Sequence, residues 1–582
     1  MMNVVKIFLA IVVFIGAVSA QDQLTAGKEA LAKKQYDEAI SSFTMYYKVN
    51  ARTAEANYWL GEAYRQKGMY DSSLYWLDRA LDFDDEHEAA LSADIYVNGK
   101  LNRWDKAQKR YDAAMKYHKK SILAPKMFAD AYLEADSLDK ASIYYSKMKE
   151  IDNNNADAYV GLAEVYARQN VIVLAVDNLR TAVSLKPKDA VLHYNLAAMI
   201  LKNRSLNKEM IEEVLTHLNE SINLDPTNER AIFDAANTLY RIAINTPKFY
   251  SDAAQYFKKY LDLNKTNAEV WDKYAISLYN AKVYGDAISA LEQAMKMNPN
   301  DFGLKPMLAH SYFVEKDYKK TIDTYKNIPS DSLDKEAYFR IGYSYFQLKD
   351  TANAMKNLEK SLAMDPGNID AAGTLAYIYL SQKNYAKAVT NYELIIKNDP
   401  QNLTALFYAG FSYSVLGKID TAKNYFKQLI TLKPGYIPAR MYLANMYSLL
   451  DSIEQSKFHY NIVIEQSDSS MKADPKKADS YKSNMISSYR ALAIFSYKDN
   501  DILSAINILL KAVELENKSK QDEGLHLFLA QMYAVKSGDQ KISPEEAKTY
   551  RQKACQEYLL VLKLNPKNAA AKKESAQMNC GK

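Results

Sequence analysis

Small, apolar and aromatic residues recur along the chain at fixed positions in units of 34 residues. In the stretch 403–436, Gly410 stands at position 8, Tyr413 at position 11, Ala422 at position 20 and Phe426 at position 24. Apolar residues three and four positions apart lie on one face of a helix, so each unit predicts two amphipathic helices. The small residues allow the two helices to approach closely, and the large ones fill the space beside them. The pattern therefore predicts a series of helical hairpins.

Proline marks the end of many units. Pro366, Pro400 and Pro434 are 34 residues apart, and seven of the fourteen prolines occupy this position. Because proline cannot continue a helix, it is common just beyond a helix C-terminus. The small residues at position 8 are Gly61, Ala163, Ala197, Ala275, Gly342 and Ala376. Those at position 20 are Ala39, Ala107, Ala141, Ala175, Ala253, Ala287, Ala354, Ala388, Ala422 and Ala505. The repetition indicates a repeat protein.

This spacing resembles the signature of the tetratricopeptide repeat family, in which W-x2-L-G-x2-Y is followed by A-x3-F and then by P. The stretch 57–80 carries it through Leu60, Gly61, Tyr64 and Leu77. The resemblance covers almost the whole chain after residue 20, and it implies an all-α, right-handed α-solenoid of about fifteen helix-turn-helix units. The units are predicted to start near residues 20, 54, 88, 122, 156, 190, 229, 268, 302, 335, 369, 403, 437, 486 and 523.

Insertions and irregular units suggest how the array is divided. We predict a signal peptide at 1–20, about thirteen repeats at 21–466, an insertion and possible boundary at 467–485, further repeats at 486–568 and a polar capping tail at 569–582. Unit three departs from the pattern, because Asp94 and Ile95 stand where leucine and glycine are expected. A solenoid tolerates one irregular unit, since its stability comes from interfaces between neighbours.

The first twenty residues have the form of a signal peptide. Lys6 precedes an unbroken run of twelve apolar or small residues, 7–18, and Val18 and Ala20 fit a signal-peptidase site. Twelve residues are too few for a membrane span, which needs about 20. An uncleaved anchor is the alternative. We expect cleavage after Ala20, export, and no direct membrane span afterwards; the short signal and the lack of a disulfide framework favour a Gram-negative periplasm.

Composition excludes several classes of protein. The chain has 582 residues, of which 48% are hydrophobic and 25% charged, so it is neither disordered nor a multi-span membrane protein. The net charge of +5 is too small for a nucleic-acid footprint, and no nucleic-acid partner is expected. Only 17 glycines and 14 prolines occur, which favours helices joined by short connections over a β-rich fold.

The sequence contains none of the motifs that carry catalysis or metal binding. Phosphate-binding, dinucleotide-binding, nucleophile-elbow and zinc-protease motifs are absent, and the seven histidines are scattered without helical spacing. The acidic stretch 82–88 lacks the glycine and final glutamate of a calcium loop, so a solvated helix boundary is favoured. Cys555 and Cys580 could form a disulfide after export, but two unpaired thiols are favoured. We expect no enzymatic activity, cofactor or metal.

The resemblance also implies where a partner would bind, because the concave face of such a solenoid is lined by positions 2, 5, 9, 12 and 13 of the first helices. In units seven to twelve these positions hold aromatic residues that the repeat core does not need: Phe233, Tyr240, Tyr279, Phe313, Phe339, Tyr343, Phe346, Tyr377, Phe407 and Phe411. Aromatic side chains are enriched at binding hot spots, so a partner-binding groove is favoured over packing between neighbouring helices. Tyr343 and Phe411, both at position 9, are its predicted anchors.

In units two to five the same positions predict an acidic lining, with Arg65 and Arg168 as exceptions. The carboxylates are Glu55, Glu62, Asp130, Glu134, Asp157 and Glu164. The clamp for acidic chaperone tails needs lysine at position 5 and asparagine at position 9. Pairs such as Tyr58/Glu62 and Phe407/Phe411 do not provide it, so chaperone-tail binding is disfavoured.

The function that these features favour is a non-enzymatic scaffold that holds a segment of a partner protein in its groove. By analogy with the family, the partner is expected in an envelope or outer-membrane assembly, such as a secretion or transport machine. The alternative is a regulatory subunit of an envelope enzyme complex that recruits a ligand or glycan on the same aromatic face. The partner's identity, the choice among peptide, helix and glycan, and the oligomeric state stay open at this point.

Overall fold

The computed structural model describes residues 20–299, 303–517 and 521–581. Every regular element in these residues is a helix and none is a strand, which confirms the all-α prediction. The chain divides into two compact units, Met1–Asn300 and Asp301–Lys582, and each is described by itself. The predicted signal peptide lies outside the described residues except for Ala20, the first residue described, which is helical together with the rest of 20–32.

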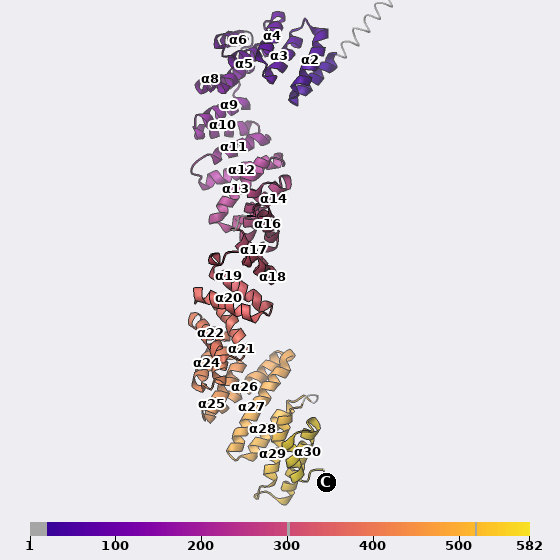
Figure 1. The fold of residues 1–582 in the computed structure, drawn as a ribbon, viewed down its shortest axis with the longest axis vertical. Helices are drawn as coiled ribbons and strands as arrows, with labels where there is room; N and C mark the ends of the chain where they lie inside the picture. The colour runs from indigo at the N-terminus through magenta and orange to yellow at the C-terminus, as the bar shows by residue number, and fades with distance from the viewer. Residues whose placement is uncertain (1–19, 300–302, 518–520, 582) are drawn as a thin grey trace, which may run out of the picture. The chain divides into compact units, whose positions relative to one another are not determined.

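In the described part of the first unit, eight helical hairpins follow one another along the chain (Figure 1). The helix 20–32 pairs with α2 (Tyr36–Asn50). The other pairs are α3 (Ala54–Lys67) with α4 (Tyr70–Phe83), α5 (Glu88–Lys100) with α6 (Trp104–Tyr117), α7 (Leu123–Glu134) with α8 (Leu138–Ile151), α9 (Ala156–Arg168) with α10 (Ile172–Leu185), α11 (Ala190–Leu201) with α12 (Lys208–Leu224), α13 (Glu229–Asn245) with α14 (Tyr250–Leu263), and α15 (Ala268–Asn280) with α16 (Tyr284–Met297).

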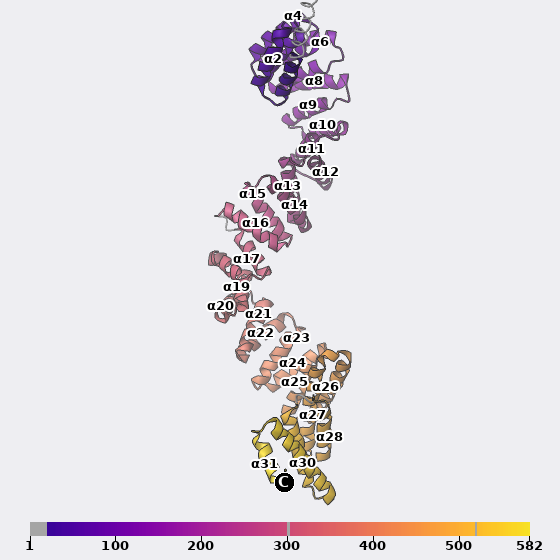
Figure 2. The same cartoon turned by 90° about the vertical axis from the view of Figure 1, so that its right-hand side faces the viewer.

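The second unit contains seven hairpins and a final helix among its described residues. The pairs are α17 (Lys305–Val314) with α18 (Tyr318–Lys326), α19 (Lys335–Gln347) with α20 (Thr351–Met364), α21 (Ile369–Ser381) with α22 (Tyr385–Asn398), α23 (Leu403–Val415) with α24 (Ile419–Leu432), α25 (Ile437–Leu449) with α26 (Ile453–Ala473), α27 (Ala478–Lys498) with α28 (Ile502–Glu514), and α29 (Glu523–Ser537) with α30 (Pro544–Leu564). The last helix, α31 (Ala569–Gln577), packs on α30 beside it (Figure 2).

Turn residues set the limits of the hairpins. Asn368 and Asn402 follow the unit-ending prolines by two residues and cap α21 and α23, where their Oδ1 atoms accept hydrogen bonds from the backbone N–H groups of Ala371 and Ala405, both at 3.0 Å. In most hairpins, position 15 adopts a left-handed conformation. It is glycine at Gly68 and Gly417, but a lysine, asparagine or aspartate at Lys34, Asn102, Asp136, Asn170, Lys282, Lys316, Lys349, Lys383, Asp451 and Asn500. These residues reverse the chain in the space of two or three residues.

The two small-residue positions form the contact between the helices of each hairpin, as predicted. The alanines at position 20 are all buried without measurable exposure. A Cβ atom on Gly342 would lie 2.8 Å from Leu358 Cγ and 2.9 Å from the Leu358 backbone nitrogen, and one on Gly410 would lie 3.0 Å from the Phe426 ring. Such distances leave no room for a side chain at the glycine. The backbone of the first helix therefore packs directly against residues of the second helix.

The irregular third hairpin has a first helix that is buried along most of its length. Residues 90–99 of α5 are all buried, because α5 contacts α3 and α7 as well as its partner α6. Asp94 is 1% exposed; Asn98 donates a hydrogen bond to it, and Arg110 Nε lies 3.3 Å from its Oδ2. Burial raises the pKa of Asp94 to about 6, although Arg110 acts in the opposite direction.

The structure differs from the predicted boundary at 467–485. This segment continues α26 to Ala473 and, after a 3-10 turn at Pro475–Lys477, begins α27 at Ala478 instead of near 486. The inserted residues therefore lengthen both helices, which pack on each other. The segment interrupts the 34-residue period, but its polar residues are suited to the exposed sides of long helices.

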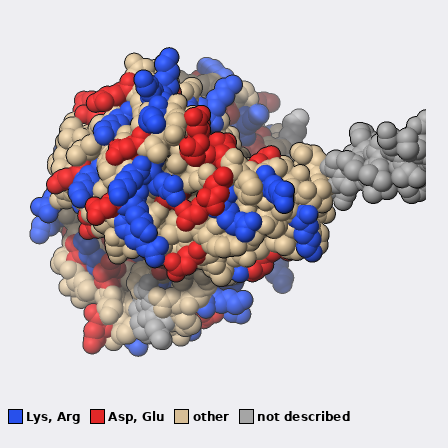
Figure 3. All heavy atoms as spheres, turned by 90° about the horizontal axis from the view of Figure 1, so that it is seen from above, with Lys and Arg blue, Asp and Glu red and all other residues tan. Residues whose placement is uncertain are grey.

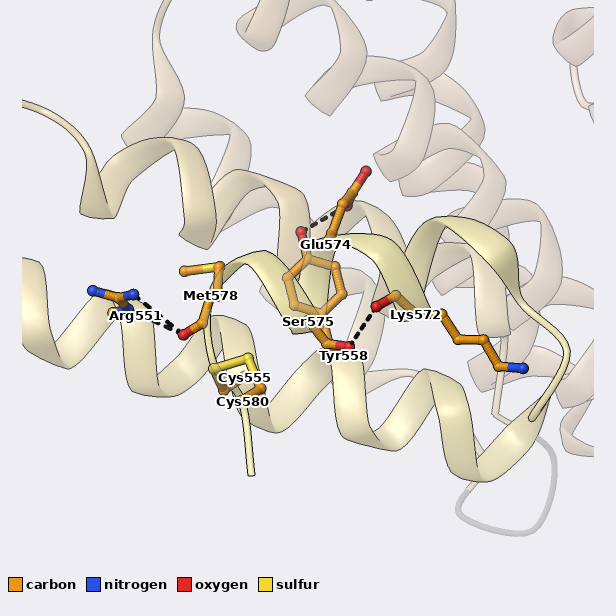
Figure 4. The surroundings of a disulfide bond; sticks show 8 residues. All are labelled: Arg551, Cys555, Tyr558, Lys572, Glu574, Ser575, Met578 and Cys580. Carbon is orange, nitrogen blue, oxygen red and sulfur yellow. Dashed lines mark hydrogen bonds between the residues drawn. A yellow bond between two sulfur atoms is a disulfide. The ribbon is translucent and has the colours of Figure 1, made fainter. Parts of the chain in front are cut away.

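The expectation of two unpaired thiols is wrong, because Cys555 and Cys580 form a disulfide (Figure 4). Their Cα atoms are 5.1 Å apart, and the bond joins α30 to the residues after α31. Arg551 of α30 adds two hydrogen bonds, from Nε and Nη2 to the carbonyl oxygen of Met578 at 3.3 and 3.2 Å. The predicted tail thus contains the helix α31, which covalent and polar contacts fix to the last hairpin.

Candidate functional site

First helices of successive hairpins contact one another in both units. In the first unit α3 contacts α5, α5 contacts α7 and α7 contacts α9, while in the second unit α17 contacts α19, α19 contacts α21 and α23 contacts α25. All ten aromatic residues predicted as a groove lie on first helices, three in the first unit and seven in the second. A partner that lies on these helices would therefore meet positions that repeat from one hairpin to the next.

Five of the predicted aromatic residues form a connected group in the second unit. The Phe313 ring on α17 contacts Phe339 and Tyr343 on α19, with centroids 6.3 and 5.7 Å apart. Tyr343 contacts Phe346 at 6.1 Å, and Phe346 contacts Tyr377 on α21 at 5.8 Å. These distances are typical of favourable edge-to-face ring pairs. The group thus continues across three successive hairpins.

Tyr318, which the sequence reasoning missed, belongs to the same group. Its ring contacts Phe313 and Tyr343 at 6.2 Å each from the first turn of α18. An aromatic residue recurs at this repeat position, as in Tyr36, Tyr70, Trp104, Tyr284 and Tyr385, and that recurrence is the signal that could have identified it. We call the six residues Phe313, Tyr318, Phe339, Tyr343, Phe346 and Tyr377 the aromatic strip.

Tyr377 of the aromatic strip and Tyr379 of the repeat core differ in exposure. Tyr377 is 56% exposed, and the other five members are partly exposed. Tyr379, two residues further along α21, is 5% exposed, and its hydroxyl donates a hydrogen bond to Glu359 Oε1 at 2.9 Å. Burial and the Glu359 carboxylate raise the pKa of Tyr379 to about 12. Neighbouring tyrosines on one helix therefore have different surroundings, one buried and one open to solvent.

Phe407 and Phe411 have no ring contact with the aromatic strip and pack against the core formed by α23, α24 and α25. Phe407 contacts the fully buried Phe426 at 6.0 Å, and both Phe407 and Phe411 contact Tyr442 at 5.7 Å. Both are only partly exposed and pack on the α23–α25 core. The structure therefore gives Phe411 a packing role that the prediction of an anchor did not include, because Tyr442 of the next hairpin covers it.

The three predicted residues of the first unit also contact rings of their own hairpins. Phe233 contacts Tyr260 at 5.6 Å, Tyr240 contacts Tyr250 at 5.9 Å, and Tyr279 contacts Tyr284 at 5.8 Å. In each pair the second ring comes from the second helix. These contacts close the gap between the two helices of a hairpin and do not link one hairpin to the next.

The acidic lining predicted in the first unit is neutralised by neighbouring side chains. Glu62 is 6% exposed and forms an ion pair with Arg65 at 2.6 Å. The guanidinium of Arg65 also lies over the Tyr96 ring. The Tyr96 hydroxyl and Lys100 Nζ donate to Glu134 at 2.8 and 2.7 Å. Burial alone would raise the pKa of Glu134, but these hydrogen bonds lower it. The lining is therefore a network that joins α3, α5 and α7.

The other predicted carboxylates have basic partners as well. Lys126 pairs with Asp130 at 2.6 Å, Lys186 with Asp157 at 2.9 Å, Arg168 with Glu164 at 2.9 Å and Lys28 with Glu55 at 4.0 Å. The face of the molecule in Figure 3 likewise has basic and acidic side chains interspersed, without a large area of one sign among the residues described there. The lining offers little free negative charge to a partner.

The described residues hold no group of three histidine, cysteine, aspartate or glutamate side chains that could bind a metal. Two histidines do meet, because the Nδ1 atoms of His193 on α11 and His217 on α12 are 2.9 Å apart. The contact between these two histidines was not predicted from the sequence, because they belong to different helices. No helix in the described part of the chain is long and apolar enough to cross a membrane.

Comparison with known proteins agrees with the hairpin geometry. Tetratricopeptide repeat models match residues 24–88, 345–408 and 404–435. The chain is a multi-tetratricopeptide-repeat protein. The tetratricopeptide repeats of the structure extend from residue 20 to α30, far beyond these matched segments, because irregular repeats keep the helix pairing while they lose signature residues.

Relatives of this tetratricopeptide-repeat protein are distant. The TPR repeat-containing protein YpiA of Bacillus subtilis is 20% identical over 53% of this chain and 71% of its own length. Anaphase-promoting complex subunit 3 of Schizosaccharomyces pombe is 26% identical over 32% of this chain, which spans only 27% of that relative. The solved C-terminal part of a TPR repeat-containing protein from Cytophaga hutchinsonii is 18% identical over 42% of this chain and 96% of that one, with a TM-score of 0.35.

Proposed function

We propose that the protein is a non-enzymatic scaffold that binds a segment of a partner protein on the aromatic strip. The observation that carries the proposal is the unbroken series of ring contacts from Phe313 to Tyr377, made by residues that keep part of their surface open to solvent. Large, rigid aromatic side chains provide much contact area at low cost in conformational entropy, which is why they dominate protein interfaces.

The repeat geometry favours an elongated partner segment. The aromatic strip takes residues from α17, α18, α19 and α21, so an occupant that covers it must extend over three successive hairpins. The mutual ring contacts fix the rotamers of Tyr343 and Phe346 before binding. Less side-chain entropy is then lost on association, which supports binding through a preformed surface.

We propose an exported, oxidising location for this scaffold, with a partner in an envelope or outer-membrane assembly. Two independent features support it. The apolar run at 7–18 followed by Ala20 has the form of a cleavable signal, and the Cys555–Cys580 disulfide is a bond that persists in oxidising compartments. The assignment of the partner to a secretion or transport machine rests on analogy with the family.

The test is affinity capture from envelope extracts with the full-length protein and matched variants. The double variant Tyr343→Ala/Tyr377→Ala removes two rings of the aromatic strip. Its control is Tyr75→Ala on α4, a tyrosine 55% exposed but on a second helix. We expect one stoichiometric protein, cross-linked to α19 or α21, to be retained by the wild type and the control and lost by the double variant. Equal capture by all three proteins, or capture of polysaccharide alone, would contradict the proposal.

A further inference from the structure

A hollow lies near the C-terminal end of the second unit, away from the aromatic strip. It has a volume of about 370 Å³ and is lined by residues of α27, α29, α30 and α31. Its walls combine the rings of Tyr497 and Phe528, the apolar side chains of Met532 and Val535, and the carboxylate of Glu574. This size is within the range of pockets that hold small ligands or single side chains.

Glu574 is the one charged residue in the described lining of this hollow. Its carboxylate accepts a hydrogen bond from the Tyr558 hydroxyl at 2.8 Å (Figure 4) and two from Gln531 Nε2, both at 3.2 Å. These donors are neutral, and Glu574 forms no ion pair with another described residue, so its negative charge stays uncompensated. A carboxylate held in place by neutral donors beside an open hollow attracts a positive group.

The rings of the hollow suit the same kind of ligand. Tyr497 and Phe528 are perpendicular, with centroids 6.5 Å apart and planes at 87°, and Tyr497 is 46% exposed and so reachable from solvent. Aromatic faces attract cations through their quadrupole. The thioether of Met532 and the methyl groups of Val535 provide an apolar surface for the stem that carries the charge.

We propose that this hollow binds an organic cation, an ammonium or guanidinium group on an aliphatic stem, with the charge at Glu574 and the stem against Met532 and Val535. The ligand is either the side chain of a partner's lysine or arginine or a free small amine. The site shares no residue with the aromatic strip, so a failure of this proposal can be distinguished from a failure of the function proposed above.

The disulfide supports this site because it fixes α31, which forms one side of the hollow. Glu574, Gln577 and Met578 all come from α31 and its C-cap, and the Cys555–Cys580 bond together with Arg551 fixes that end of the chain to α30. Without the bond, the short helix α31 would keep its hydrogen bonds from Arg551, Tyr558 and Gln531 and the packing of residues such as Ala571, but no covalent link to α30. Cation binding is therefore expected to weaken when the disulfide is removed.

Calorimetric titration of the full-length protein with n-butylammonium tests the charge requirement, and n-butanol is the uncharged probe. Glu574→Gln keeps an acceptor for Tyr558 but removes the charge, and it is expected to weaken n-butylammonium binding about tenfold. Lys573→Gln, an exposed charge change on the same helix, is the control and should leave the affinity unchanged. Tyr497→Leu, which removes a ring at an exposed position, is expected to weaken binding about fivefold.

Two further arms complete the test. An acetylated peptide with a central lysine is compared with its norleucine analogue; a peptide that binds through lysine more tightly than n-butylammonium identifies a partner side chain, and the reverse order identifies a free amine. The Cys555→Ser/Cys580→Ser protein should bind n-butylammonium at least threefold more weakly. The proposal is overturned if n-butylammonium binds no better than n-butanol, or if Glu574→Gln binds it as tightly as Lys573→Gln.

Discussion

Two tyrosines on α21 provide a direct test of which aromatic residues form surface and which form core. Tyr379→Ala removes a buried ring together with a hydrogen bond to Glu359. Removing a buried aromatic side chain costs roughly 3–5 kcal/mol, of which about 1 kcal/mol belongs to such a hydrogen bond. Glu359 is exposed and can be hydrated when its donor is lost. We therefore expect a loss of about 3 kcal/mol in local stability.

Tyr377→Ala should lower local stability much less than Tyr379→Ala does. An aromatic side chain covers about 200 Å² when fully buried, and less than half of Tyr377 is covered, because it is 56% exposed. At about 25 cal/mol per Å² this burial is worth at most roughly 2 kcal/mol. Alanine regains about 0.5 kcal/mol through its higher helix propensity and keeps part of the contact. A net loss of about 1 kcal/mol remains.

Hydrogen exchange measured by mass spectrometry is the suitable assay, because a long repeat array does not unfold in one step and has no single free energy of unfolding. The difference of about 2 kcal/mol predicts that amides of α21 and α22 exchange roughly 30-fold faster in Tyr379→Ala than in Tyr377→Ala. Partner capture should show the opposite order. Equal acceleration of exchange in the two variants would refute the division between strip and core, since Tyr377 would then be a packing residue.

Three other changes probe the fold. Gly342→Ala should lower the stability of the α19–α20 hairpin by roughly 1–3 kcal/mol, because its Cβ would lie 2.9 Å from the Leu358 backbone nitrogen. Gly285→Ala is the control: apart from its chain neighbours and the backbone of its own helix, no atom of the described residues lies within 4 Å of its Cβ, so hydrogen exchange should show no loss of stability. The pKa of Asp94 is raised to about 6, so the folded state binds a proton more tightly than the unfolded chain does. The local stability around α5 should therefore fall by on the order of 3 kcal/mol as the pH rises from about 4 to about 6. Asp94→Asn should abolish that dependence in α5 exchange, and a wild-type-like pH profile would contradict the assignment. Cys580→Ser should reduce protection of α31 by about 2–4 kcal/mol, and protection equal to that of the oxidised wild type would show that packing alone holds the helix.

The repeat architecture could be predicted from the sequence because its determinants are local and are repeated many times. An alanine at position 20 or a proline at a unit end has the same neighbours in every hairpin, so one interpretation is tested by many copies. Helix starts such as Ala54, Ala156 and Leu403 coincide with the predicted unit starts. The insertion at 467–485 has no second copy, and it was there that the prediction of a boundary differed from the structure.

The candidate sites were harder to predict, because they depend on side-chain contacts between residues far apart in sequence. Concave-face positions led to the prediction of Tyr343, Tyr377 and Phe411 as binding residues, but they did not indicate that Tyr442 of the next hairpin contacts the Phe411 ring. Some ion pairs of the first unit join helices of different repeats, as Lys100 and Glu134 do, and sequence spacing does not indicate them. The pairing of the two cysteines likewise required the position of α31, which spacing alone does not give.

The bond between Cys555 and Cys580 also changes what a break in the polypeptide would mean. It closes a ring of covalent structure across a sequence separation of 25 residues, and the exposed Pro566 and Lys567 lie within that ring, between α30 and α31. Trypsin acting at Lys567 would cut the backbone but would not release the end of the chain. The two polypeptides would migrate as one molecule until a reductant separated them, so electrophoretic mobility under non-reducing conditions is no measure of an intact backbone.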